Sequence, residues 1–134
     1  MGRDCAANGV RFVSSGGGEP LEWTGLFETL EGLKGVLGRS FTTNGLELVK
    51  RPALFEEIAR ARPDKVHVSI HAVENQREVI RFIERVHALD AREVPTGVNL
   101  LVRQSHLADA RAVVAQLDRS GSAGCLPRCR ARGE

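Results

Sequence analysis

Three glycines followed by a glutamate and a proline, residues 16–20, stand directly after a short apolar segment, Val10–Val13. The β-branched and aromatic side chains of that segment predict a short buried strand that ends at the serines and glycines. Consecutive glycines lose much conformational entropy on folding, so they indicate a backbone with unusual dihedral angles or one that a ligand approaches closely. Pro20 favours an extended backbone at Glu19, which we expect to direct the carboxylate away from the following helix.

Together these residues predict an open cradle of backbone carbonyl groups with one carboxylate, that of Glu19. Such a cradle suits a cationic group such as an amine. It suits a phosphate poorly, because no Lys or Ser/Thr follows in the position that a P-loop requires and the nearby charge is negative. The alternative interpretation is a tight turn between strand and helix with no ligand.

A second group of polar residues lies on a predicted strand, Lys65–Ile70. Side chains alternate between the two faces of a strand, which here gives an apolar face and a polar face. The apolar set is Val66, Val68 and Ile70, and the polar set is His67, Ser69 and His71. We expect the apolar face to pack on helices and the polar face to point into a cavity that holds a polar ligand. Two alternatives stay open: a zinc site that includes both histidines, and a structural pair of hydrogen-bonded side chains.

Helix and strand patterns alternate along the chain at intervals of roughly thirty residues. Further strands are predicted at Arg39–Thr43, Lys65–Ile70 and Gly97–Val102, and helices over 26–37, 52–62, Gln76–Leu89 and 107–117. This alternation is typical of the βαβ repeat and predicts an α/β fold with a parallel sheet, either a partial TIM-barrel-like barrel or a small open sheet. Both architectures place ligand sites at the carboxyl ends of the strands.

Length and composition predict one compact domain, since the chain has 134 residues and 42% of them are hydrophobic. We expect this domain to cover residues 1–119 and residues 120–134 to form a disordered or loosely attached tail. A net charge of +2 is too small to indicate nucleic acid or an anionic membrane as a partner. Without an apolar span or a signal peptide, a cytoplasmic protein is expected. The three cysteines, an odd number, argue against a disulfide scaffold.

The glycine motif and the turn Thr43-Asn44-Gly45 resemble the GGEP motif and the TNG turn of the radical SAM superfamily, in which they occur in the same order. The resemblance covers roughly residues 6–117 and implies a partial TIM-barrel-like core that binds S-adenosylmethionine. In that family the GGEP backbone and its acidic side chain hold the methionine amino group, the end of a later strand contacts the ribose, and the following strand receives the adenine. The cofactor-binding residues implied here are Gly17, Gly18, Glu19, Pro20, Ser69, His71 and Asn99.

The cysteines of this chain depart from the family pattern. Radical SAM enzymes hold a [4Fe-4S] cluster with the three thiolates of a C-x-x-x-C-x-x-C loop, which leaves one iron open to the cofactor. Cys5, Cys125 and Cys129 do not form such a loop, so no metal ligand and no catalytic residue is predicted within the chain. The expectation is a fragment of an enzyme that reductively cleaves S-adenosylmethionine to a 5'-deoxyadenosyl radical and acts on an unidentified small molecule.

Further expectations follow from this interpretation. The chain alone is expected to be catalytically inactive, and an unpaired edge of its sheet is expected to favour association. Two alternatives from other classes stay open. One is an ordinary α/β-barrel enzyme for a small polar metabolite, with Glu19, His67 and His71 as acid and base groups. The other is a non-catalytic module that binds nucleosides.

Overall fold

Residues 2–119 are described in the computed structural model of the chain, and their four strands form one parallel sheet. The strands are β1 (Phe12–Ser15), β2 (Gly38–Thr43), β3 (Lys65–Ile70) and β4 (Thr96–Leu100). They lie in the order β1-β2-β3-β4, and each neighbouring pair is parallel. The predicted α/β fold with a parallel sheet is confirmed.

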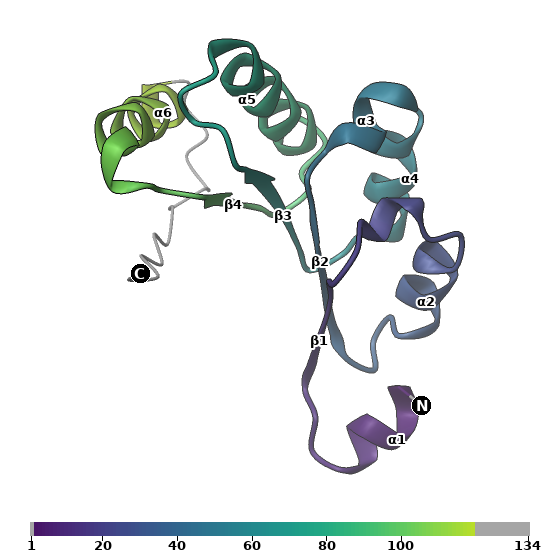
Figure 1. The fold of residues 1–134 in the computed structure, drawn as a ribbon. Coiled ribbons are helices and arrows are strands. Elements are labelled where there is room, and N and C mark those ends of the chain that lie inside the picture. The colour runs from purple at the N-terminus through teal and green to yellow at the C-terminus, as the bar shows by residue number, and fades with distance from the viewer. Residues whose placement is uncertain (1, 120–134) are drawn as a thin grey trace.

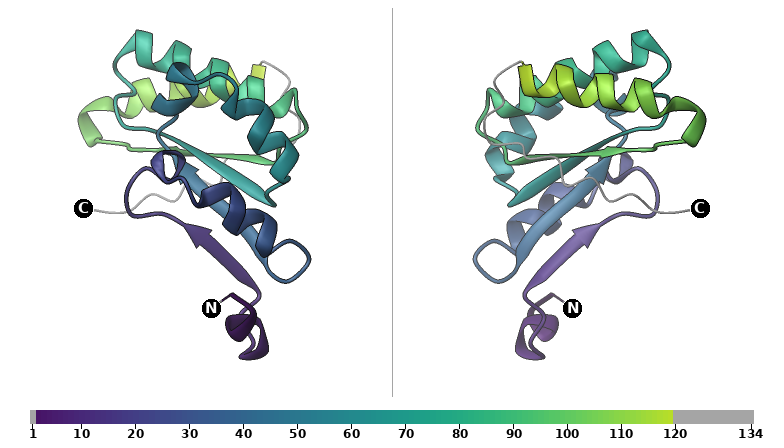
Figure 2. Two further views of the ribbon diagram at one scale, coloured as in Figure 1. Left: turned by 90° about the vertical axis from the view of Figure 1, so that its right-hand side faces the viewer. Right: turned by 90° about the vertical axis from the view of Figure 1, so that its left-hand side faces the viewer.

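Helices cover one side of this sheet. They are α1 (Gly2–Ala7), α2 (Leu26–Gly32), α3 (Leu46–Lys50), α4 (Leu54–Ala61), α5 (Gln76–Asp90) and α6 (Leu107–Arg119), with short 3-10 helices η1 (Pro20–Glu22) and η2 (Gln104–His106). Figures 1 and 2 show α2 to α6 on the same side of the strands, whereas α1 lies beside the amino end of β1. Within residues 2–119, no helix has the length and apolar character needed to cross a bilayer.

The hydrophobic core lies between the sheet and these helices, and β3 is its central strand. Val66, Val68 and Ile70 are buried, while His67 and Ser69 on the opposite face are half-buried. The predicted division of this strand into an apolar and a polar face is confirmed. Phe41, Phe82, Leu26 and Val79 are among the side chains that complete the core.

β1 differs from its prediction as a buried strand. It begins at Phe12 rather than Val10, and Phe12 and Val13 have 52% and 37% of their surface exposed, so the prediction of burial was wrong. The physical reason is its place in the sheet. β1 is an edge strand that pairs with β2 alone, and no other described segment covers its second edge. A parallel strand normally has both faces covered, so β1 is only partly enclosed by the described residues.

Other element boundaries also needed correction. The helix predicted over 26–37 ends at Gly32, because the chain then turns through Gly35, whose φ of 74° is left-handed. Helix α3 was not predicted, and the last strand ends at Leu100 rather than Val102. The predicted tail, residues 120–134 with Cys125 and Cys129, lies outside the described residues.

Candidate functional site

The loops that follow β1, β2 and β3 meet at one edge of the sheet, which we call the carboxyl edge. Because all strands are parallel, the glycine loop after β1, the turn after β2 and His71 after β3 all belong to this edge. Ligand sites of open α/β sheets and of α/β barrels lie at this edge. The structure therefore brings the predicted glycine motif and the predicted Thr43-Asn44-Gly45 turn to the same place.

The glycine loop is exposed and leaves free space beside its backbone. Gly17 has a left-handed φ of 94°, which explains why glycine is required there. A Cβ added at Gly16, Gly17 or Gly18 would meet no atom within 4 Å, so no described neighbour requires a glycine at Gly16 or Gly18. Among the described residues, no backbone hydrogen bond of the loops uses the peptide groups of these glycines. Those groups are available to a ligand.

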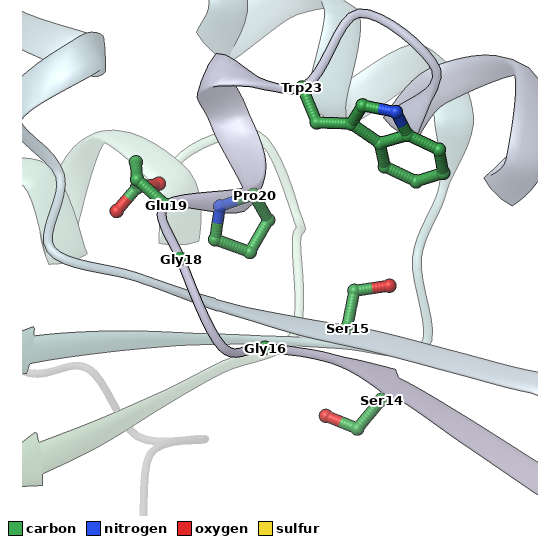
Figure 3. Close-up of a pocket in the computed structure, with 7 residues that line it drawn as sticks. All are labelled: Ser14, Ser15, Gly16, Gly18, Glu19, Pro20 and Trp23. Atoms are coloured by element: carbon green, nitrogen blue, oxygen red, sulfur yellow. The ribbon is translucent and has the colours of Figure 1, made fainter.

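An open hollow of about 370 Å³ lies against this loop, within the size range of small-molecule sites. It is lined by Ser14, Ser15, Gly16, Gly18, Glu19, Pro20 and Trp23. Figure 3 shows the indole of Trp23 and the carboxylate of Glu19 on opposite sides of Pro20. Trp23 is 52% exposed, which leaves its ring accessible, and sequence reasoning missed it. Its position three residues after Pro20, as the only tryptophan of the chain, was the available signal.

The Glu19 carboxylate is held by three hydrogen bonds. Its Oε1 accepts from the Leu21 amide at 3.2 Å and the Thr43 hydroxyl at 2.5 Å, and its Oε2 accepts from the Asn44 amide at 2.9 Å. The extended backbone predicted at Glu19 is confirmed, with φ −89° and ψ 107°. The predicted direction of the carboxylate was wrong, because it turns back to cap η1, whose first amides have no partner within the helix.

These bonds leave limited capacity on the carboxylate. An ionised carboxylate has about four acceptor positions, so three accepted bonds leave about one, on Oε2. Glu19 therefore contributes negative charge and one further hydrogen bond to a ligand. Its other acceptor positions join the glycine loop to the turn after β2.

The turn Thr43-Asn44-Gly45 is itself closed by side-chain hydrogen bonds. The Gly45 amide donates to the Thr43 hydroxyl oxygen at 3.0 Å, and the Leu46 amide donates to Asn44 Oδ1 at 2.9 Å. Gly45 has a left-handed φ of 77° and precedes α3 directly. Thr43, with 1% of its surface exposed, is the buried link between the turn and Glu19.

Two arginines that sequence reasoning missed contact this assembly from the helices. Arg85 of α5 is 5% exposed and donates from Nη1 to the Asn44 carbonyl at 3.2 Å. Arg51, directly after α3, donates from Nη2 to the Leu21 carbonyl at 2.8 Å. Burial lowers the pKa of Arg85, and the positive charge of Arg81 lowers it further. The negative charges of Glu78 and Glu84 act in the opposite direction and raise it. The available signal for Arg85 was its spacing from Phe82 and Leu89, which places it on the apolar stripe of α5.

The polar face of β3 carries the remaining predicted residues. Ser69 pairs in register with Asn99 of β4, and Asn99 Nδ2 donates to Ser69 Oγ at 3.5 Å. His71 is exposed and lies one residue beyond β3. Burial lowers the pKa of His67, and the charge of Lys65 lowers it further. Across residues 2–119, no three His, Cys, Asp or Glu side chains lie together as metal ligands, which leaves the zinc alternative without a third ligand there.

The two parts of the candidate site lie on the same sheet. Neighbouring strands are about 4.8 Å apart, so β3 lies roughly 10 Å from β1 and β4 about 14 Å from it. An elongated ligand could therefore contact the glycine loop at one end and Ser69 with Asn99 at the other.

Comparison with known proteins gives no assignment, because no family model, no curated protein and no solved structure matches this chain significantly.

Proposed function

We propose that this chain supplies the S-adenosylmethionine-binding loops of a radical SAM core. The methionine amine would lie at the glycine loop beside Glu19, and the nucleoside would extend along the sheet toward Ser69 and Asn99. The observation that carries the proposal is the arrangement of Glu19, which three hydrogen bonds fix beside a glycine loop whose own peptide groups are unused.

An ammonium group fits this arrangement chemically. It has three N–H donors and a positive charge, so it needs acceptors and a negative charge but no donors. Glu19 offers the charge and about one acceptor position, and the glycine loop offers carbonyl oxygens. The other end of the ligand would meet hydroxyl and amide groups at Ser69 and Asn99, which can donate to and accept from ribose hydroxyls or an adenine.

The residues of this chain do not fit the [4Fe-4S] cluster that the family uses. Its three cysteines lack the C-x-x-x-C-x-x-C spacing, and the part of the chain that the structure describes has no group of three metal ligands. Any cluster ligands would have to come from outside this chain. We therefore assign binding and orientation of the cofactor to these loops, and no bond-breaking step. A cytoplasmic location and a small-molecule substrate belong to the same proposal.

The rival assignment of Glu19 as an acid or base is less well supported. A carboxylate that accepts three hydrogen bonds is fixed in place and has about one acceptor position left. That environment suits a holding role better than proton transfer.

Calorimetric titration of the chain with S-adenosylmethionine tests the proposal. Glu19→Gln removes the charge and should weaken binding about 10- to 100-fold, the scale of a charged hydrogen bond of about 1.5 to 3 kcal/mol. Glu22→Gln is the matched control, because Glu22 is an exposed glutamate on the same 3-10 helix. Absence of binding to the wild-type chain, or equal affinity of Glu19→Gln, would contradict the proposal. Turnover of a metabolite without iron would favour an ordinary enzyme instead.

A further inference from the structure

We propose that Arg85 is a positioning residue for the amine site, and that it acts through the turn after β2. The inference rests on the proposed function for its ligand, but the contacts that carry it are independent of any ligand. They run from α5 to the turn and from the turn to Glu19.

The first contact joins Arg85 to Asn44. Arg85 Nη1 donates to the Asn44 carbonyl at 3.2 Å, and the amide of the same residue donates to Glu19 Oε2 at 2.9 Å. Asn44 is thereby held on one side by a buried cation and binds the carboxylate on the other. A shift of Asn44 would lengthen its bond to Glu19 directly.

The second contact is steric and involves Gly45. A Cβ at Gly45 would lie 2.7 Å from Cδ of Arg85 and 3.0 Å from its Nη1, so the turn and the arginine side chain are packed closely. The Gly45 amide also donates to the Thr43 hydroxyl oxygen, whose own hydrogen is donated to Glu19. Arg85 therefore limits the positions of the Asn44 and Gly45 amide groups, which lie before and after the Asn44 carbonyl in the chain.

The stability of the fold does not explain an arginine at this position. Nε and Nη2 of Arg85 are buried and have no hydrogen-bond partner among residues 2–119. Buried donors without partners are unfavourable, and an apolar side chain of similar length can replace a buried charged group at no loss of stability. The charged groups nearest to it on α5 are Glu78, Arg81 and Glu84, which influence its charge without bonding to it. We attribute the arginine at this position to the effect of its single hydrogen bond on the turn.

This argument predicts a specific combination of effects for Arg85→Met. The free energy of unfolding should stay equal or rise, whereas exchange of the Asn44 amide hydrogen and the dissociation constant for S-adenosylmethionine should each rise about tenfold. Arg85→Lys should restore part of the Asn44 protection, because the ammonium group can still donate to the carbonyl. Arg92→Met serves as the control, since Arg92 binds Glu56 and the Ala88 carbonyl rather than the turn.

The experiment combines urea denaturation, amide hydrogen exchange by NMR and calorimetric titration with S-adenosylmethionine on the full chain. Faster Asn44 exchange at unchanged stability, with partial recovery in Arg85→Lys, is the expected result. Unchanged Asn44 exchange in Arg85→Met would overturn the inference, because Arg85 would then not act through the turn. Unfolding of that variant would also overturn it, because Arg85 would then have a structural role. If the wild-type chain binds no S-adenosylmethionine, the proposed function fails, while the exchange measurement still decides the role of Arg85.

Discussion

The two buried arginines within residues 2–119 lie at opposite edges of the sheet and are bonded very differently. Arg39, at the start of β2, is 4% exposed and donates to three backbone carbonyls, those of Leu30, Ala61 and Arg62. Its Nε lies 3.6 Å from Oδ2 of Asp64 and has no hydrogen-bond partner among the described residues. Arg85, near the carboxyl edge, makes a single hydrogen bond to residues 2–119 and has two nitrogens, Nε and Nη2, without a partner there.

This difference fits our proposal, in which the amino edge stabilises the fold and the carboxyl edge holds the ligand. At the amino edge, one guanidinium bonds the carboxyl-terminal ends of α2 and α4, so its bonds hold the fold together. At the carboxyl edge, within residues 2–119, two nitrogens of Arg85 lack partners, no backbone hydrogen bond of the loops uses the glycine peptide groups, and Trp23 is exposed. Such features are unfavourable for stability and must be compensated by the rest of the fold. They are typical of sites where a ligand binds. Variants at each edge can test this division.

The largest effect is expected at the amino edge, from Arg39→Met. The substitution leaves three carbonyl acceptors without their donor, two of them in buried bonds, so the free energy of unfolding should fall by about 3 to 5 kcal/mol. Urea denaturation measures this loss, and Arg85→Met provides the comparison with no loss. A fall below about 1 kcal/mol for Arg39→Met would remove the distinction between the two edges.

The two left-handed glycines of the carboxyl edge should respond unequally to alanine. Gly45→Ala should lower the free energy of unfolding by about 2 to 3 kcal/mol, because backbone strain adds to the close approach of Arg85. Gly17→Ala should lower it by only about 1 to 2 kcal/mol, since its Cβ would meet open space. Thermal or urea unfolding of both variants checks the order. Equal losses would mean that the packing of Arg85 against the turn is unimportant.

The Thr43 hydroxyl should contribute a smaller amount. Thr43→Val keeps the branched shape but removes the group that bonds Glu19 and Gly45, so it should lower the free energy of unfolding by about 1 to 2 kcal/mol. Thr42→Val is the matched control on the neighbouring position, which faces the other side of β2. A similar loss of unfolding free energy in both variants would show that the hydrogen bond from Thr43 to Glu19 adds no stability of its own.

The smallest effect is a pH dependence from His67. Its pKa is lowered below the ordinary value of 6.5, first by burial and then by Lys65, so the unfolded state binds more protons as the pH falls below 6.5. The free energy of unfolding should therefore decrease as the pH falls through this range, by an amount reduced by the partial exposure of the side chain. His67→Gln should flatten this slope in urea denaturation between pH 7.5 and 5.5, and an unchanged slope would contradict the assignment.

Sequence patterns predicted strand β3 and helix α5 well, and the edge strand β1 poorly. The bounds of β3 were predicted as observed because strict alternation over Lys65–Ile70 is a local signal. The start of α5 at Gln76 follows from the Asn75 cap, which accepts from two amides. The exposure of β1 could not be predicted, because burial of an edge strand depends on which segments lie beside it.

The sequence indicated which motif forms the candidate site, but not the hydrogen bonds that join its parts. The glycine motif was predicted as a binding loop and the turn after β2 only as part of the family resemblance, and the structure joins them through Glu19. The role of Glu19 as an acceptor of internal hydrogen bonds depends on Thr43 and Asn44, which lie more than twenty residues further along the chain. Arg85 could be identified as unusual from its place on an apolar stripe, but its target carbonyl is set only by the packing of α5 on β3.

The most direct test of the account is an NMR titration of the labelled chain with S-adenosylmethionine, following backbone amide shifts at both edges of the sheet. The account predicts shifts of Gly17, Gly18 and Asn44 together with Ser69 and Asn99, and constant shifts for Arg39 and Asp64 at the amino edge. Saturable shifts confined to the carboxyl edge would support binding by the glycine loop and the polar face together. Absence of shifts at saturating cofactor, or shifts centred on the amino edge, would contradict it.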